Sequence, residues 1–138
     1  MAKSQFEVGL QNHKSLIEGW MNKYVPLTTP LQSALYSGDD TVGVGTTIID
    51  TSDIFGAPVG IKAAEVLFRA RWSVATVNSY MLIRPVGSSR YADILYAYST
   101  DLQIKNSKIP CDSNGDFELT VANAPANQVL LEIWGFWI

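Results

Sequence analysis

Cysteine, histidine and charged side chains are scarce in this sequence. It has 1 cysteine and 1 histidine, and charged residues make up 17% of it, against about a quarter in typical globular proteins. A single cysteine, Cys111, cannot form a disulfide within the chain, which is typical of a protein folded in a reducing cytosol. With His13 as its only histidine, one chain cannot build a zinc site of the usual composition. We therefore expect no disulfide framework, no metal site and no cofactor.

Long apolar runs and an excess of basic residues are also missing. No run approaches the roughly 18 apolar residues that a membrane-spanning helix requires. The N-terminus, MAKSQFEVGLQNHK, lacks the apolar segment of a signal peptide. With 10 Lys and Arg against 13 Asp and Glu, the net charge is -3, which argues against a nucleic-acid partner. We expect neither membrane insertion nor nucleic-acid binding.

The apolar content is sufficient for one folded domain. Hydrophobic residues make up 47% of the 138 residues and aromatic residues 11%. A chain of about this length buries roughly two thirds of its unfolded surface on folding. We therefore expect a single globular domain with its own core.

Residues 12–24, NHKSLIEGWMNKY, have the spacing of an amphipathic helix. Such a helix is too short to be stable alone in water, so its apolar stripe must pack on its own domain, on a partner protein or on copies of itself. The following VPLTTP predicts an extended connector. This places a boundary between an assembly arm, residues 1–25, and a β-domain, residues 26–138. The apolar stripe of the arm consists of Leu16, Ile17, Trp20, Met21 and Tyr24.

After residue 40 the apolar periodicity changes to 2. In VLFRARWSV, residues 66–74, apolar side chains alternate with Leu67, Arg69, Arg71 and Ser73, as in a half-buried antiparallel strand. Gly, Pro, Asn and Asp clusters separate the segments and predict turns. The pattern predicts an all-β fold, an antiparallel β-sandwich of jelly-roll type preceded by the helical arm. The expected strands are 42–50, 66–74, 79–86, 92–100, 101–109, 116–123 and 128–138.

The final segment, LLEIWGFWI, is apolar on both of its predicted strand faces. Only Glu132 interrupts it, so we expect it to be covered on both sides. One cover is its own core, and the other is a neighbouring subunit or the chain's own arm. We favour a symmetric oligomer, because the large rings of the second face would contribute several kcal/mol of contact. The predicted oligomer interface consists of Leu130, Trp134, Phe136 and Ile138.

The sequence contains no convergent set of reactive groups, so no catalytic residues are predicted. Cys111 has no neighbour that would lower its pKa, and a structural role is expected. DSNGD, residues 112–116, begins like a calcium loop but lacks the later glutamate, and a hairpin turn explains it better. A carboxylate pair for catalysis would have to come from Asp93, Asp101 or Glu118, whose spacing singles out none of them.

Two groups of side chains are candidates for ligand binding. The arginines at 69, 71, 84 and 90 would suit an acidic ligand, but arginines on strands more commonly pair with carboxylates on adjacent strands. The tyrosines at 91, 96 and 98 would suit the apolar face of a sugar ring, but tyrosines are also ordinary strand residues. Arg90 and Tyr91 are the candidate ligand-binding residues.

Four segments together resemble a family of small proteins and fibre-terminal domains encoded by tailed bacteriophages and prophages. They are VPLTTPL, IIDTSDIFGAPVGIKA, IPCDSNGDF and the terminal LLEIWGFWI. Members of that family have a proline-threonine entry, two glycine turns and a closing Gln-Ile-Trp-Gly-Tyr-Trp-Leu. Here Phe136 and Ile138 stand where tyrosine and leucine are common. The resemblance covers residues 26–138 and rests on structural motifs.

This resemblance implies a virion β-sandwich protein made in the host cytoplasm, located on the tail as a fibre or spike or on the head as a decoration. Together with the residue patterns, it predicts a non-enzymatic structural protein, a homotrimer whose arm binds another virion protein and whose loops take part in host attachment. A capsid decoration or head-fibre protein and a lectin-like module that binds a host surface glycan remain as alternatives.

Overall fold

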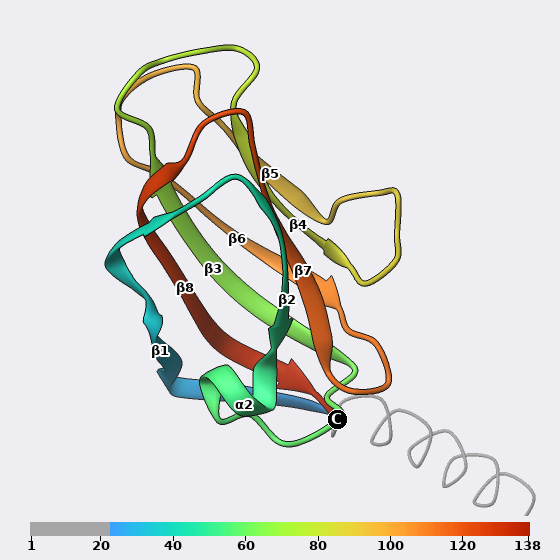
Figure 1. The fold of residues 1–138 in the computed structure, drawn as a ribbon. Helices are drawn as coiled ribbons and strands as arrows, with labels where there is room; N and C mark the ends of the chain where they lie inside the picture. Colours follow the sequence, from blue (N-terminus) through green and yellow to red (C-terminus); the bar gives the residue numbers. More distant parts are fainter. Residues whose placement is uncertain (1–22) are drawn as a thin grey trace, which may run out of the picture.

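The computed structural model describes residues 23–138, which form two four-stranded antiparallel sheets (Figure 1). This confirms the all-β, antiparallel prediction. The predicted helix and its stripe residues Leu16, Ile17, Trp20 and Met21 lie outside the described residues. The first sheet has the order β1 (Tyr24–Val42), β8 (Ala126–Trp137), β3 (Ala63–Arg71), β6 (Gln103–Pro110). The second has the order β2 (Gly45–Asp50), β7 (Asp116–Ala122), β4 (Tyr80–Pro85), β5 (Asp93–Tyr96), and the short helix α2 (Thr51–Phe55) follows β2.

One hydrophobic core receives side chains from both sheets. In β3, Val66, Phe68 and Ala70 are fully buried, and the intervening residues are partly exposed. The predicted alternation is therefore correct within β3, but Val74 lies beyond the strand end and is 71% exposed. Burial of each large apolar side chain contributes roughly 1.5–3 kcal/mol. The opposite sheet contributes Ile49, Met81, Ile83, Leu95, Phe117, Leu119 and Val121.

Strand β1 corrects the prediction of a connector. The segment 25–30 lies in this edge strand, where Tyr24 pairs with Trp137 and Val25 with Phe136. Tyr24 thus belongs to the sheet and not to the stripe of a helix. The prolines are tolerated because β1 has no further strand on its other side, and because its register shifts between Pro26 and Leu31.

A β-bulge in β8 corrects the predicted orientation of Phe136. Val66 pairs with Ile133 and the adjacent Glu65 with Gly135, so Trp134 is an extra residue opposite β3. An extra residue reverses the alternation that follows it. Phe136 is therefore in the core at 7% exposure, whereas Leu130 and Trp134 are half-buried and Ile138 is 49% exposed.

The ring of Tyr24 covers Gly135 at the edge of this bulge. A Cβ atom added to Gly135 would lie 2.5 Å from Tyr24 Oη. The Tyr24 hydroxyl donates to Glu65 Oε2 at 2.5 Å, and its ring centroid lies 4.5 Å from that of Trp137. Lys108 Nζ lies 4.3 Å from the Trp137 ring. Part of the outer surface of β8 is thus covered by its own chain.

The segments 48–63, 109–117 and 130–138 meet at the α2 end of the sheets. Thr51 Oγ1 donates to the Gly115 carbonyl at 2.7 Å, which joins α2 to the 112–116 turn. Lys62 N donates to the Trp137 carbonyl at 2.7 Å, and Cys111 N donates to the Lys62 carbonyl at 2.9 Å. These bonds hold the end of β8 against two turns, so these segments have structural roles.

Substitution of Gly135 by alanine should destabilise the fold by about 1–3 kcal/mol, because the new methyl group would collide with the Tyr24 ring. A loss of stability is unusual here, since replacing a strand glycine with alanine ordinarily raises the free energy of unfolding by about 0.5–1 kcal/mol. Urea unfolding measures the cost. Gly43→Ala, where an added Cβ meets nothing within 4 Å, is the control. An undiminished cost of Gly135→Ala in a Tyr24→Ala background would contradict the explanation.

Phe136→Ala should lower the free energy of unfolding by about 3–5 kcal/mol, because it leaves a cavity in the core. Ile138→Ala, at the exposed end of the same segment, should cost less than about 1 kcal/mol. Chemical unfolding at several protein concentrations tests both. A cost of Phe136→Ala that varies with protein concentration would assign its ring to a subunit interface instead.

Candidate functional site

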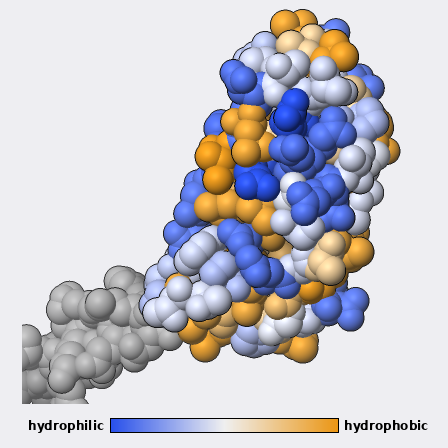
Figure 2. Space-filling view, turned by 90° about the vertical axis from the view of Figure 1, so that its left-hand side faces the viewer, coloured by the Kyte–Doolittle hydropathy of each residue, from blue (hydrophilic) through white to orange (hydrophobic). Residues whose placement is uncertain are grey.

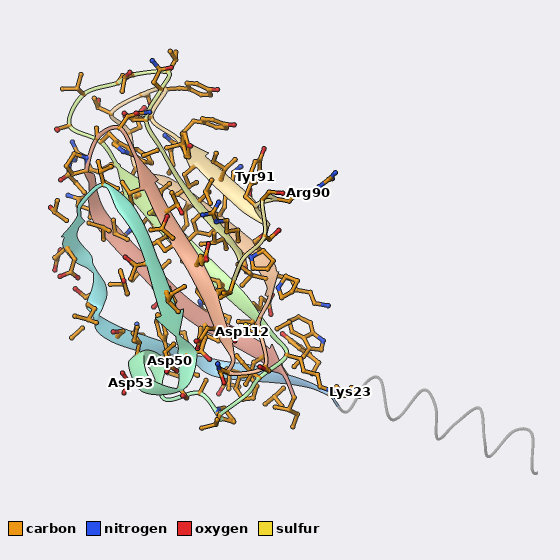
Figure 3. The ribbon with its side chains drawn as sticks, turned by 45° about the vertical axis from the view of Figure 1, so that its right-hand side comes forward. Lys23, Asp50, Asp53, Arg90, Tyr91 and Asp112 are labelled. Atoms are coloured by element: carbon orange, nitrogen blue, oxygen red, sulfur yellow. The ribbon has the colours of Figure 1, made fainter. Side chains whose placement is uncertain are left out.

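The predicted ligand-binding residues Arg90 and Tyr91 lie on the exposed loop between β4 and β5 (Figure 3). With Ser89 they line an open depression of about 320 Å³. Since its lining comes from three consecutive residues, this depression lacks the convergence of groups from several elements that defines most binding sites.

The predicted tyrosines do gather, and Tyr80 joins them. The rings of Tyr96 and Tyr98 are stacked, with centroids 4.9 Å apart and planes 8° apart. Tyr80, the cross-strand partner of Tyr96, meets it edge-on at 6.3 Å. Desolvation and the neighbouring phenol of Tyr91 raise the pKa of Tyr96 above its ordinary value. We call Tyr80, Tyr91, Tyr96 and Tyr98 the tyrosine row; Tyr91 and Tyr98 are 51% and 65% exposed.

The β3–β4 loop and the β7–β8 turn lie at the end of the sheets opposite to α2 (Figure 1). Residues of both line a larger cavity. Its volume is about 610 Å³, and it is open to solvent. All of its lining side chains are uncharged, and most carry a hydroxyl or an amide. The lining consists of Thr41, Trp72, Ser73, Val74, Thr76, Asn78, Ser79, Asn123, Ala124, Pro125 and Asn127. We call it the loop-end cavity.

Hydrogen bonds hold the cavity wall in place. Thr41 Oγ1 donates to Asn127 Oδ1 at 3.1 Å, and the Asn123 amide donates to the Asn78 carbonyl. Trp72 is 1% exposed, and its Nε1–H has no acceptor within residues 23–138. Buried tryptophans usually satisfy this group, and an unpaired buried donor costs about 1–3 kcal/mol. The wall thus contains one donor that the described chain leaves unused.

The loop-end cavity and the tyrosine row are joined through Ala97. Thr76 N donates to the Ala97 carbonyl at 2.7 Å, and Ala97 N donates to the Ser79 carbonyl at 2.9 Å. Thr76 and Ser79 line the cavity, and Ala97 lies between Tyr96 and Tyr98. The two features therefore belong to the same end of the molecule.

Three of the other predicted candidates, Arg84, Asp93 and Glu118, have local partners. The guanidinium of Arg84 donates to Glu118 at 2.6 Å, and Glu118 also accepts from Gly87 N at 3.3 Å. Asp93 pairs with Lys105 at 3.2 Å. Arg84 is therefore used in the way that is commoner for strand arginines, and Asp93 and Glu118 each neutralise a different cation.

The segment around Cys111 is a turn, as predicted. Asp112 Oδ1 accepts from Asn114 N at 3.0 Å and from Asp116 N at 2.9 Å, which closes the β6–β7 hairpin. Burial, with the nearby Asp112 and Asp116 carboxylates, raises the pKa of the Cys111 thiol to about 12. Burial, with Asp112 and Asp50, also raises the pKa of Asp116. Among residues 23–138, no group of three or more His, Cys, Asp or Glu side chains is placed to hold a metal ion.

The loop-end cavity was not predicted from the sequence, although the composition of two segments carries a signal for it. Residues 73–79, SVATVNS, and 123–127, NAPAN, have hydroxyl or amide side chains and no charged ones. Each segment also fits a plain turn, and only the fold brings the two together.

Comparisons with protein-family models, with curated proteins and with solved structures found no match. No helix within residues 23–138 has the length and apolar character needed to cross a membrane.

Alkylation of Cys111 by iodoacetamide at pH 8 should be roughly a hundredfold or more slower in the folded protein than in urea, because only the thiolate reacts. Mass spectrometry of time points measures both rates. Equal rates in the two states would show that the thiol is neither buried nor shifted in pKa.

Proposed function

We propose that this chain is a non-enzymatic structural protein of a tailed-bacteriophage virion, which assembles as a homotrimer in a tail fibre or spike. The observation that carries the proposal is the outer face of the first sheet, where β8 presents half-buried apolar side chains beside β3 and β6. The resemblance of residues 26–138 to virion proteins supports the same reading, as does the amphipathic pattern of the arm, which would anchor the protein on another virion component.

The strand order supports the finer description of the fold as a jelly-roll sandwich. The two sheets have the orders 1-8-3-6 and 2-7-4-5, so that the chain crosses repeatedly between sheets. A jelly roll places eight strands in two Greek keys, an architecture common in viral capsid and lectin domains. Fold alone does not establish function, but this architecture is consistent with a virion or lectin role.

The outer face of the first sheet has the mixed character of an assembly surface. Leu67, Leu130 and Trp134 are half-buried there, and Ile104 is 57% exposed. Figure 2 shows hydrophobic residues interspersed with hydrophilic ones on the side where β1 and β8 lie. β8 lies between β1 and β3, so Trp134 is set back from the edges of the sheet. Tryptophans in such central positions contribute much of the binding energy of interfaces.

The alternative is that the protein lies on the phage head, as a capsid decoration or head-fibre protein. Such a protein would use the same face on a capsid lattice and need not form a trimer in solution. A lectin-like module is the second candidate function, and the loop-end cavity with the tyrosine row favours it.

Light scattering on the full chain tests the proposal. We expect the mass of a trimer, and we expect Leu67→Glu or Ile104→Glu to shift it toward the monomer, because each introduces a charge on the outer face. Val59→Glu, at a residue 84% exposed in the loop after α2, is the control and should leave the mass unchanged.

A second variant, the double substitution Ile17→Asp with Trp20→Asp, distinguishes oligomerisation through the arm from oligomerisation through the first sheet. A trimer that dissociates only in this variant would assign oligomerisation to the arm. A monomeric parent chain would contradict the trimer and favour the decoration protein.

A further inference from the structure

We infer that the loop-end cavity and the adjoining tyrosine row form one binding site for an uncharged saccharide. The saccharide is the class of ligand that the protein would bind in the proposed host attachment. The inference rests on the proposed function only for the source of that saccharide, the host surface. The site uses residues that are separate from the outer face of the first sheet, so binding and assembly can be measured independently.

The chemistry of the lining selects an uncharged, polyhydroxylated ligand. Asn78, Asn123 and Asn127 provide amides that both donate and accept hydrogen bonds. Thr41, Thr76 and the serines add hydroxyl groups of the same dual character. A phosphate, sulfate or carboxylate ligand would need a cation to compensate its charge, and the lining contains none. The volume of about 610 Å³ lies within the roughly 300–1,000 Å³ typical of small-molecule sites.

The tyrosine row supplies an aromatic surface next to these polar groups. The ring of Tyr98 is 65% exposed, and its stacking on Tyr96 holds it in a fixed orientation. Pyranose rings carry C–H groups on one face, which pack on aromatic rings, while their hydroxyl groups bind amides and hydroxyls. A saccharide that lies across Ala97 would use both kinds of contact at once.

Two further observations support an occupant at this end of the molecule. Trp72 lines the cavity, and its buried indole N–H has no acceptor among residues 23–138; such groups are rare in native proteins. Val74, which lines the cavity from the β3–β4 loop, is 71% exposed, so the loop presents apolar surface at the cavity without using it in the core.

The test is binding of the full chain to an array of neutral hexose and N-acetylhexosamine oligosaccharides, with sialylated and uronic-acid oligosaccharides alongside. Calorimetry then gives the Kd of the strongest neutral binder. We expect neutral saccharides to bind, and Asn78→Ala and Tyr98→Ala each to weaken binding by about tenfold, the effect of losing one good contact. Both residues are exposed, so the variants should fold, and thermal unfolding checks this.

Two controls locate the site. Asn114→Ala and Lys62→Ala each remove an exposed side chain at the α2 end; both should leave the Kd within about twofold, since neither residue lines the cavity or belongs to the tyrosine row. No binding to any neutral saccharide would overturn the inference. So would binding of charged saccharides alone, or binding that Arg90→Ala abolishes while Asn78→Ala preserves it.

Light scattering on the same samples keeps the two proposals apart. Variants that lose saccharide binding but remain trimeric would show that the substituted residues act in the saccharide site and not in assembly. Saccharide binding by a monomeric parent chain would contradict the proposed trimeric fibre and would still support the saccharide site.

Discussion

The position of β8 between β1 and β3 is the constraint on which the rest of the structure depends. This strand pairs along both edges, and its inward side chains lie in the middle of the core. Its bulge at Trp134 turns Phe136 inward and leaves Gly135 beneath the Tyr24 ring. Since the Trp137 carbonyl also accepts from Lys62 N, the final strand joins the first sheet to the loop that follows α2.

This arrangement gives the two ends of the molecule different properties. At the α2 end, side-chain and backbone hydrogen bonds connect Thr51 with Gly115 and Lys62 with Cys111, and these segments are committed to packing. At the opposite end, the loops are bonded chiefly through their backbones at Thr76, Ser79 and Ala97. Thr41, Thr76, Asn123 and Asn127 use their side chains for bonds within the cavity wall. The other lining side chains are available to a ligand, as is usual for loops that a rigid scaffold positions.

The sequence predicted those parts of the fold that follow from local periodicity. β3 alternates cleanly, so its inward residues were identified, and the Asp112 turn has distinctive composition. β1 was missed because Pro26 and Pro30 read as a connector, and only pairing with β8 makes this edge strand. Phe136 was misplaced because a bulge depends on the register with β3 and leaves no local pattern. The loop-end cavity combines Thr41, Asn78 and Asn127 from distant segments, so no local sequence motif predicts it.

Two carboxylates on the outer face of the first sheet have hydrogen-bond donors within the chain. Glu65 accepts from the Tyr24 hydroxyl, and Glu132 accepts from the Gln32 amide at 2.6 Å, which lowers the cost of removing these carboxylates from water. Assembly through this face would leave the loop-end cavity open, because the cavity lies at the end of the sheets. In the proposed trimer, three weak saccharide sites would bind one surface together, and linked sites gain about 10²–10⁴ in avidity without any new contact. Modest affinity at each cavity is therefore compatible with firm attachment of the whole particle.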